Sequence, residues 1–334
     1  MYEKQFVTTT SGNVPLHLSD VKDATDRIKP LIHRTPVLTA RTLDQLVGAQ
    51  VFLKAECYQR AGAFKIRGAL NKVLQLSAEE RARGLFAWSS GNHAQAVALA
   101  AQIVGTTATI LMPKDAPEAK VLAVREYGAE IISYDRYTED REALAQRLVC
   151  ERNAVSVPPY DDPAIMAGQG TVALELFEQV EQLDILLVPT GGGGLIAGCA
   201  TVATSLNPQC RVYGVEPLAG NDTKLSLDAG TRVRIPVPHT IADGQQVQIP
   251  GELTFAVNRR LLTDILLVTD EEILVAMAFL FERLKVIAEP SGASAVAALL
   301  AGKVNVANLR VGVVISGGNV GVQRFCTLLA SRNG

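Results

Sequence analysis

The segment DILLVPTGGGGLIAGCATVA, residues 184–203, joins two apolar runs through four consecutive glycines. Its first part is rich in branched apolar residues and predicts a buried strand, whereas its last part predicts a buried helix. Four glycines cost more conformational entropy than a tight turn explains. They are typical of backbone that wraps a phosphate, with the amide groups and the helix dipole facing the anion. A close-packed crossover from strand to helix is the alternative interpretation.

The same alternation of strands and helices continues on both sides of this segment. Short apolar runs predict strands at residues 50–55, 85–89, 107–112, 130–134, 154–158, 184–189, 211–216, 265–269 and 310–316. Longer segments predict helices at residues 94–105, 138–153, 168–180 and 270–288. Near-continuous apolar strands between helices indicate parallel sheets covered by helices, the α/β class. Ligands of such sheets bind beyond the carboxyl ends of the strands, so the strand-to-helix turns are the candidate sites.

The composition narrows the class of protein. The chain has 334 residues, a formal net charge of −2 and 48% hydrophobic residues, so no basic surface for nucleic acid or an anionic membrane is expected. Its five cysteines are scattered without a CxxC pair, which favours a reducing compartment over a disulfide framework. The sequence shows neither a signal-peptide core nor an apolar run of membrane-spanning length. We expect a soluble, cytoplasmic protein.

A lysine in an apolar setting is the first candidate for chemistry. In RAGAFKIRGA, residues 60–69, Lys65 lies between Phe64 and Ile66 with glycines nearby. A lysine beside apolar side chains loses its proton more readily, and the neutral amine is a nucleophile. Most lysines are solvated surface residues, so this hypothesis depends on the other turns.

Two further turns carry polar groups at strand ends. In WSSGNHAQAVALAA, residues 88–101, hydroxyls, a glycine and an asparagine precede a predicted helix and offer donors to an anion, although an ordinary helix cap is the alternative. In RVGVVISGGNVG, residues 310–321, a strand ends at Ser316 beside two glycines. A hydroxyl in that position can approach a flat ring edge-on.

A nucleotide-binding interpretation competes at the glycine run. Gly192, Gly194 and Ala197 satisfy the GxGxxA pattern, and Glu216 follows at the end of the next predicted strand. This arrangement is a dinucleotide fingerprint with an acid for a ribose hydroxyl.

A set of motifs spread over nearly the whole chain resembles one enzyme family. The motifs are HRTPVL, AFKIRGALNK, SSGNHAQA, DDPAIMAGQGTVALEL, PTGGGGLIAG, GVEP, EPSGA and ISGGNV. In this order they resemble the fold-type II pyridoxal-phosphate (PLP) enzymes, specifically the threonine/serine dehydratase and serine racemase family. The dinucleotide interpretation leaves Lys65 and the two hydroxyl-bearing turns without a role, and is therefore disfavoured.

The resemblance implies a two-domain α/β fold like that of the tryptophan synthase β subunit, each domain being a largely parallel sheet flanked by helices. The large PLP-binding domain is expected at residues 1–76 and 160–334, with a small domain inserted at residues 77–159.

The resemblance also implies the cofactor contacts. Lys65 would form the Schiff base with the PLP aldehyde, Phe64 would pack along the ring, Asn92 would contact the 3′ oxygen, and Ser316 would meet the pyridine nitrogen. The phosphate would lie on the backbone of Gly191, Gly192, Gly193, Gly194 and Leu195. A hydroxyl cannot keep the pyridine nitrogen protonated as a carboxylate does, so β-elimination is favoured over transamination.

The implied activity is that of an ammonia-lyase which converts L-threonine or L-serine to a 2-oxo acid and ammonia. The substrate carboxylate would lie on Ser89, Ser90, Gly91, Asn92 and His93. Lys65 would be the general base, and Ser90 would be a second acid/base on the opposite ring face, which permits racemisation. Serine racemase and threo-3-hydroxyaspartate dehydratase are alternatives at the same site, and a non-catalytic binding protein is a third.

Departures from the commoner dehydratase pattern leave the substrate open. Ala61 and Ala63 replace hydroxyl residues, as in the racemase and hydroxyaspartate-dehydratase branch, whereas residues 240–255 resemble the dehydratase branch. Glu216, Asp222 and the carbonyl of Gly220 match a divalent-cation site for magnesium, manganese or calcium, with a solvated acidic loop as the alternative. The expected partners are a small amino-acid substrate and further copies of the chain in a homodimer or homotetramer.

Overall fold

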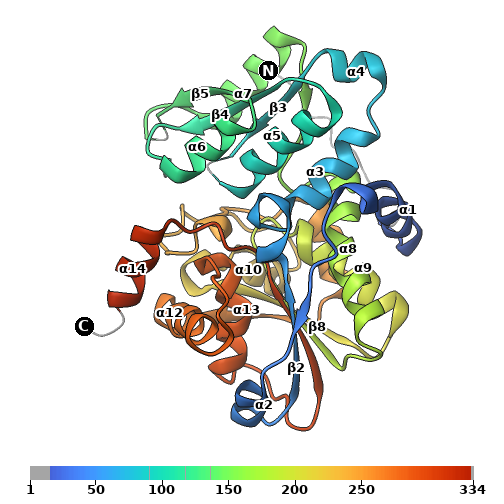
Figure 1. Ribbon diagram of the computed structural model, residues 1–334, viewed down its shortest axis with the longest axis vertical. Coiled ribbons are helices and arrows are strands. Elements are labelled where there is room, and N and C mark those ends of the chain that lie inside the picture. Colours follow the sequence, from blue (N-terminus) through green and yellow to red (C-terminus); the bar gives the residue numbers. More distant parts are fainter. Residues whose placement is uncertain (1–15, 90, 117, 136, 332–334) are drawn as a thin grey trace.

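The computed structural model describes residues 16–89, 91–116, 118–135 and 137–331. Two sheets organise the chain (Figure 1). The larger sheet has six strands in the order β1-β2-β10-β7-β8-β9. Its strands are β1 (Val37–Leu38), β2 (Gln50–Ala55), β7 (Ile185–Pro189), β8 (Arg211–Pro217), β9 (Asp264–Val268) and β10 (Arg310–Ile315). All neighbours pair in parallel except β1, which pairs antiparallel with β2.

The smaller sheet has four parallel strands in the order β5-β4-β3-β6. They are β3 (Leu85–Trp88), β4 (Ala108–Pro113), β5 (Glu130–Tyr134) and β6 (Val155–Ser156). In Figure 1 this sheet and its helices form one end of the molecule, and the larger sheet lies below it. The sheet lies within residues 77–159, whereas the exact limits of the smaller domain stay a prediction.

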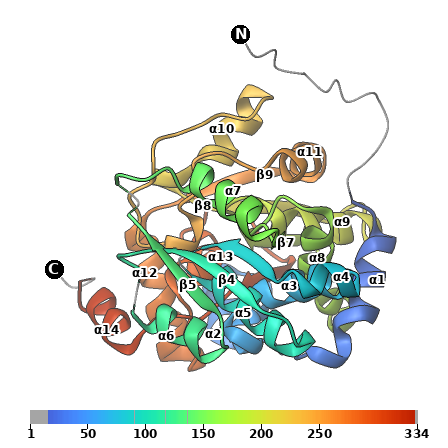
Figure 2. The same cartoon turned by 90° about the horizontal axis from the view of Figure 1, so that it is seen from above.

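Helices cover both sheets. Those associated with the larger sheet are α1 (Leu18–Ile28), α2 (Arg41–Val47), α3 (Lys65–Leu74), α8 (Pro163–Gln179), α9 (Gly194–Leu206), α10 (Asp222–Ala229), α11 (Glu252–Leu261), α12 (Asp270–Phe279), α13 (Pro290–Leu300) and α14 (Val322–Ala330). The others are α4 (Ala78–Ala82), α5 (Asn92–Val104), α6 (Glu118–Glu126) and α7 (Arg141–Arg152). Figure 2 shows α5, α6 and α7 around β4 and β5. Among the helices that can be described, none is both long and apolar enough to span a bilayer.

The structure confirms the predicted α/β class, and each of the predicted strands is present within a few residues. Strand β1 was not predicted, because two residues after a proline carry too little pattern to indicate a strand. The helix predicted for residues 270–288 is also shorter than expected. It ends as α12 at Phe279, continues as a π-helical turn to Leu284, and stops at Lys285, whose φ of 61° lies in the left-handed region.

Close helix packing positions α3, the helix that begins at Lys65. A Cβ atom on Gly168 of α8 would lie 2.6 Å from the Cα atom of Gly68 on α3. On the other side of α8, a Cβ atom on Gly198 of α9 would lie 2.5 Å from the backbone nitrogen of Gly170. The glycines therefore let α8 approach both α3 and α9 to backbone contact, so α8 connects the helix that begins at Lys65 to the helix that follows the glycine run.

Candidate active site

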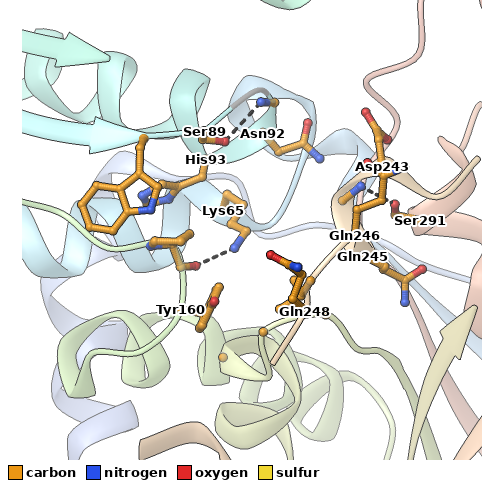
Figure 3. Close-up of a pocket in the computed structure, with 18 of the residues that line it drawn as sticks. Lys65, Ser89, Asn92, His93, Tyr160, Asp243, Gln245, Gln246, Gln248 and Ser291 are labelled. Atoms are coloured by element: carbon orange, nitrogen blue, oxygen red, sulfur yellow. Dashed lines mark hydrogen bonds between the residues drawn. The ribbon is translucent and has the colours of Figure 1, made fainter. Parts of the chain in front are cut away.

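A cavity of about 570 Å³ lies at the carboxyl ends of strands from both sheets. Trp88, Pro113 and Tyr134 line it from the smaller sheet, and Pro189 and Ser316 line it from the larger one. This is the position where parallel α/β sheets bind ligands. In Figure 3 Lys65 points into the middle of the cavity, with Ser89 and Asn92 on one side and Tyr160 and Gln248 on the other.

Lys65 is held in an unusual setting for a cation. Its ammonium donates to the carbonyl oxygen of Pro159 at 2.6 Å and lies 5.1 Å from the centre of the Phe64 ring. Burial lowers the pKa of Lys65 to about 8, because desolvation disfavours the charged form. Its place at the first turn of α3, the positive end of the helix dipole, acts in the same direction. The structure thus provides an amine that is neutral more often than an ordinary lysine.

The four glycines 191–194 lead from the end of β7 into the start of α9, and together with Leu195 they line the cavity. None of their amides donates a hydrogen bond to another group in the described part of the chain. Two of these glycines cannot be replaced by larger residues without strain. A Cβ atom on Gly192 would lie 2.2 Å from the Tyr160 ring, and Gly193 has a φ of 91°, in the left-handed region that favours glycine. Free amides at the start of a 13-residue helix form an anion site of the kind that binds phosphate.

The predicted carboxylate-binding turn lies across the cavity. Ser89, Gly91, Asn92 and His93 all line it, and α5 begins at Asn92. The Ser89 hydroxyl oxygen accepts the Gly91 amide at 3.1 Å, which leaves its own hydrogen to donate. Ser90 lies outside the described residues.

His93 does not act as a cation in this turn. Its Nε2 lies 2.8 Å from the carbonyl oxygen of Val157, which can only accept, so Nε2 carries the hydrogen. Burial lowers the pKa of His93 to about 3, and the positive charge of Lys65 adds to the effect. The imidazole is therefore neutral, and only its backbone amide can serve a carboxylate in the way that the sequence predicts.

Phe64 and Ser316 face the same cavity. The Phe64 amide donates to the Ser316 carbonyl at 3.0 Å, which ties the start of α3 to the end of β10. The Ser316 side chain is almost completely buried and forms part of the cavity wall. Thus Lys65, Phe64, Asn92, Ser316 and the glycine run, which are far apart in sequence, meet at one cavity.

A sequence model of the family described as "Pyridoxal-phosphate dependent enzyme" matches residues 28–317. The chain belongs to this family of PLP-dependent enzymes. It is 51% identical to the L-threo-3-hydroxyaspartate ammonia-lyase of Saccharomyces cerevisiae over 313 residues, 94% of this chain and 96% of that protein. It is 48% identical to the serine racemase of Schizosaccharomyces pombe over 311 residues, 93% of this chain and 96% of that one.

Solved structures of PLP-dependent enzymes have the same fold. The structure of maize serine racemase superposes with a TM-score of 0.90, covers 96% of this chain and 98% of its own, and is 41% identical in sequence. The family resemblance that the sequence motifs indicate is therefore confirmed, as is its fold.

The residues present fit PLP. The cofactor has an aldehyde, which needs an amine, and a phosphate, which needs donors. Lys65 supplies an amine with a lowered pKa, and the five amides of residues 191–195 supply donors that have no acceptor among the residues the structure describes. The cavity also holds groups that the sequence analysis did not assign: Lys120, Tyr160, Asp243, Gln245 and Glu289. Glu289 belongs to the EPSGA motif, but its sequence position alone does not show what it contacts.

The three residues of the predicted cation site lie apart from this cavity, at the carboxyl end of β8. Glu216 and Asp222 are completely buried. Glu216 accepts the amides of Thr223 and Lys224, both at 3.1 Å. It is completely buried and does not line the cavity, so it is not placed to hold a ribose hydroxyl as the dinucleotide fingerprint requires. Neither carboxylate oxygen of Asp222 has a hydrogen-bond partner among the residues described.

Burial and mutual charge repulsion disfavour the ionised forms of the two acids. Burial, and then the negative charge of Asp222, raise the pKa of Glu216 well above its ordinary value. Burial raises the pKa of Asp222 to about 7. Gly220, the third predicted ligand, is buried at the end of the turn between the two acids. The described residues contain no group of three or more acidic, histidine or cysteine side chains with metal-binding geometry.

Proposed function

We propose that the protein is a PLP-dependent ammonia-lyase for small β-hydroxy amino acids, converting them to a 2-oxo acid and ammonia. The observation that carries this proposal is the pairing of Lys65, with its lowered pKa, and the unpaired amides of residues 191–195 in one cavity. L-Serine, L-threonine and L-threo-3-hydroxyaspartate are the candidate substrates. The relative named as an L-threo-3-hydroxyaspartate ammonia-lyase supports including the third.

In this proposal each residue has a defined task. When bound, PLP holds the substrate nitrogen and withdraws electrons from the α-carbon. Lys65 removes the proton from that carbon, and the Pro159 carbonyl accepts a hydrogen bond from the resulting ammonium. The first amides of α5 and the Ser89 hydroxyl bind the substrate carboxylate. Ser316, a hydroxyl and not a carboxylate, would offer the pyridine nitrogen no anion to keep it protonated, which would favour rapid loss of the β-hydroxyl.

A substrate panel tests the proposal. The purified protein with PLP is given each candidate amino acid, and release of 2-oxo acid and ammonia is followed together with chiral analysis of the remaining substrate. We expect equal amounts of the two products from at least one candidate. If none of the three candidate substrates released 2-oxo acid and ammonia, the proposed lyase activity would be wrong.

Serine racemisation is a second candidate activity, supported by the serine racemase relative. We expect Ser90→Ala to lower racemisation by about 10²-fold or more while elimination changes far less, because only inversion needs an acid on the second face of the substrate. The two rates are measured in one reaction by chiral chromatography and 2-oxo acid assay. Equal losses in both rates would show that Ser90 mainly binds the substrate carboxylate.

We also propose that Glu216, Asp222 and the carbonyl of Gly220 bind a divalent cation such as magnesium, manganese or calcium. Two completely buried carboxylates, one of them without hydrogen-bond partners in the described structure, stay ionised at neutral pH only beside a positive charge, which a cation would supply. Oxygen ligands of this kind suit hard cations that complete their shell with water. The ion would brace the turn after β8 and would not touch the reacting carbon.

Added cation is expected to raise the melting temperature and EDTA to lower it. The stabilisation should reach about 2.7 kcal/mol at a hundredfold excess over Kd. Glu216→Gln should remove most of this response and leave the visible absorbance of bound PLP intact. Asp228→Asn, on the same helix as Asp222 but exposed, is the matched control and should respond like the wild type. A wild-type protein that is indifferent to both treatments contradicts the cation site.

The cytoplasmic location and the homodimeric or homotetrameric assembly stay predictions from the sequence and the family. Light scattering of the protein as it elutes from a size-exclusion column measures the number of chains in the assembly. A monomer would contradict the predicted homodimer or homotetramer.

A further inference from the structure

The amide of Asn92 is clamped between two side chains that have no role so far. Its Oδ1 accepts a hydrogen bond from Nδ2 of Asn319 at 2.9 Å, and its Nδ2 donates to Oε1 of Glu289. Glu289 begins the EPSGA segment before α13, and Asn319 follows the glycines after β10. Three separate parts of the chain therefore meet at this one amide.

The chemistry of the partners fixes which way the Asn92 amide points. Nδ2 of Asn319 also donates to the carbonyl oxygen of Ala61 at 2.7 Å, and a carbonyl can only accept, so the nitrogen of Asn319 is identified. The atom of Asn92 that faces this nitrogen must then be its oxygen. Its nitrogen faces Glu289, whose carboxylate accepts. Since an amide nitrogen carries two hydrogens, one Asn92 hydrogen remains for a ligand in the cavity.

Glu289 is itself held firmly in place. Only 2% of it is exposed, and a Cβ atom on Gly317 would lie 2.5 Å from its Oε1. Its backbone amide donates to the Gly317 carbonyl at 3.1 Å. The carboxylate thus packs directly against Gly317, the residue that follows Ser316, on one side and lines the cavity on the other.

The positive charge nearest to Glu289 comes from the other side of the cavity. Nζ of Lys120, on α6 beside the smaller sheet, lies 3.8 Å from Oε2 of Glu289 and 2.6 Å from Asp243. Lys120 is almost completely buried. Burial raises the pKa of Glu289 to about 7, and the charge of Lys120 opposes this rise. The lysine therefore helps to keep the carboxylate charged as an acceptor for Asn92.

We propose that Glu289 is a positioning residue for PLP binding: with Asn319 it fixes the Asn92 amide so that one hydrogen of its nitrogen faces the cofactor. This inference rests on the proposed function and on the contact of Asn92 with the 3′ oxygen of PLP that the family resemblance implies. Glu289 does not itself need to touch the cofactor. Its effect is transmitted through the direction of one amide group.

The affinity of the cofactor-free protein for PLP tests the clamp, followed by the visible absorbance of the bound cofactor during titration. Glu289→Met has similar volume but accepts no hydrogen bond from Asn92. We expect its Kd for PLP to rise about tenfold or more, with a shifted absorbance band, because a hydrogen bond to a charged group is lost. Glu289→Gln keeps a carbonyl acceptor and should recover most of the affinity and the wild-type band.

A second variant keeps the test independent of folding. Asn319→Asp keeps the size of the side chain but replaces the donor with a charged carboxylate, which loses the hydrogen bonds to Ala61 and Asn92. A carboxylate oxygen then faces Oδ1 of Asn92 and disfavours the present direction of the amide. Its Kd for PLP should also rise about tenfold. Asn305→Asp is the matched control, since Asn305 is exposed, does not line the cavity, and accepts the Ala307 amide at 3.2 Å, which an aspartate can also do. Its Kd should equal that of the wild type.

The outcomes separate this inference from the proposed function. Wild-type affinity and absorbance in both Glu289→Met and Asn319→Asp would overturn the clamp, as would a Glu289→Gln protein that binds PLP as weakly as Glu289→Met. A wild-type protein that binds no PLP would instead overturn the proposed function.

Discussion

Replacing Lys65 with alanine is expected to abolish cofactor attachment and to reduce 2-oxo acid release by at least about 10³-fold, within the range that one positioned base contributes. The reason is that Lys65 lies in the same cavity as the amides of the glycine run and has a lowered pKa of about 8, whereas the cavity residue Lys120 is paired with Asp243 at 2.6 Å. Both effects are measured on the same sample, as visible absorbance after incubation with PLP and as product release. Noncovalent PLP binding should survive, because the phosphate site is unchanged.

Lys22→Ala is the control for this prediction, since Lys22 lies on the exposed face of α1. It should match the wild type in absorbance and turnover. A Lys65→Ala protein that retained the absorbance of covalently attached PLP would show that another amine holds the cofactor.

Replacing Arg67 with methionine is expected to lower the free energy of unfolding by about 3–5 kcal/mol. Arg67 is completely buried on α3, two residues after Lys65. Its guanidinium binds Glu56 at 2.7 Å and Glu175 at 2.7 Å, and Lys54 shares Glu175 at 2.7 Å. Removing the guanidinium leaves two carboxylates in the core with only one lysine to balance them, and uncompensated buried charge is costly.

Denaturant unfolding of the cofactor-free protein measures this loss. Arg34→Met removes the exposed ion pair of Arg34 with Glu178, which spans 3.1 Å between side chains that are both about half exposed, and should change stability by about 0–1 kcal/mol. Similar small changes in both variants would contradict the view that the buried network stabilises α3 and the position of Lys65.

The sequence carries enough information for the sheets and for part of the site, because both depend on local patterns. Apolar strands follow from short-range composition, and a glycine run or a lysine between apolar residues is visible without tertiary structure. Arg67 and Lys54 were not singled out, because a charged residue in a helix or strand usually faces solvent and nothing local shows that it is buried. Their partners lie far along the chain, as with Arg67 and Glu175, which are 108 positions apart.

The same reason explains why the role of Glu289 was not predicted. The motif that contains it contributed to the family resemblance, but the contact with Asn92 joins residues 197 positions apart. The residues of the predicted cation site were chosen from a motif, whereas the burial of both carboxylates and the lack of hydrogen-bond partners for Asp222 in the described structure became visible only in the fold.

The most direct test of the central claim, that Lys65 holds PLP, is borohydride reduction of the wild-type protein with its cofactor, followed by peptide mass analysis. Reduction makes the bond between a lysine and a bound aldehyde permanent, so the modified residue can be read from the mass of its peptide. We predict that the cofactor mass is found on the peptide that contains Lys65 and on no other. Cofactor on a different lysine, or its complete removal by denaturation after reduction, would contradict this account of the active site.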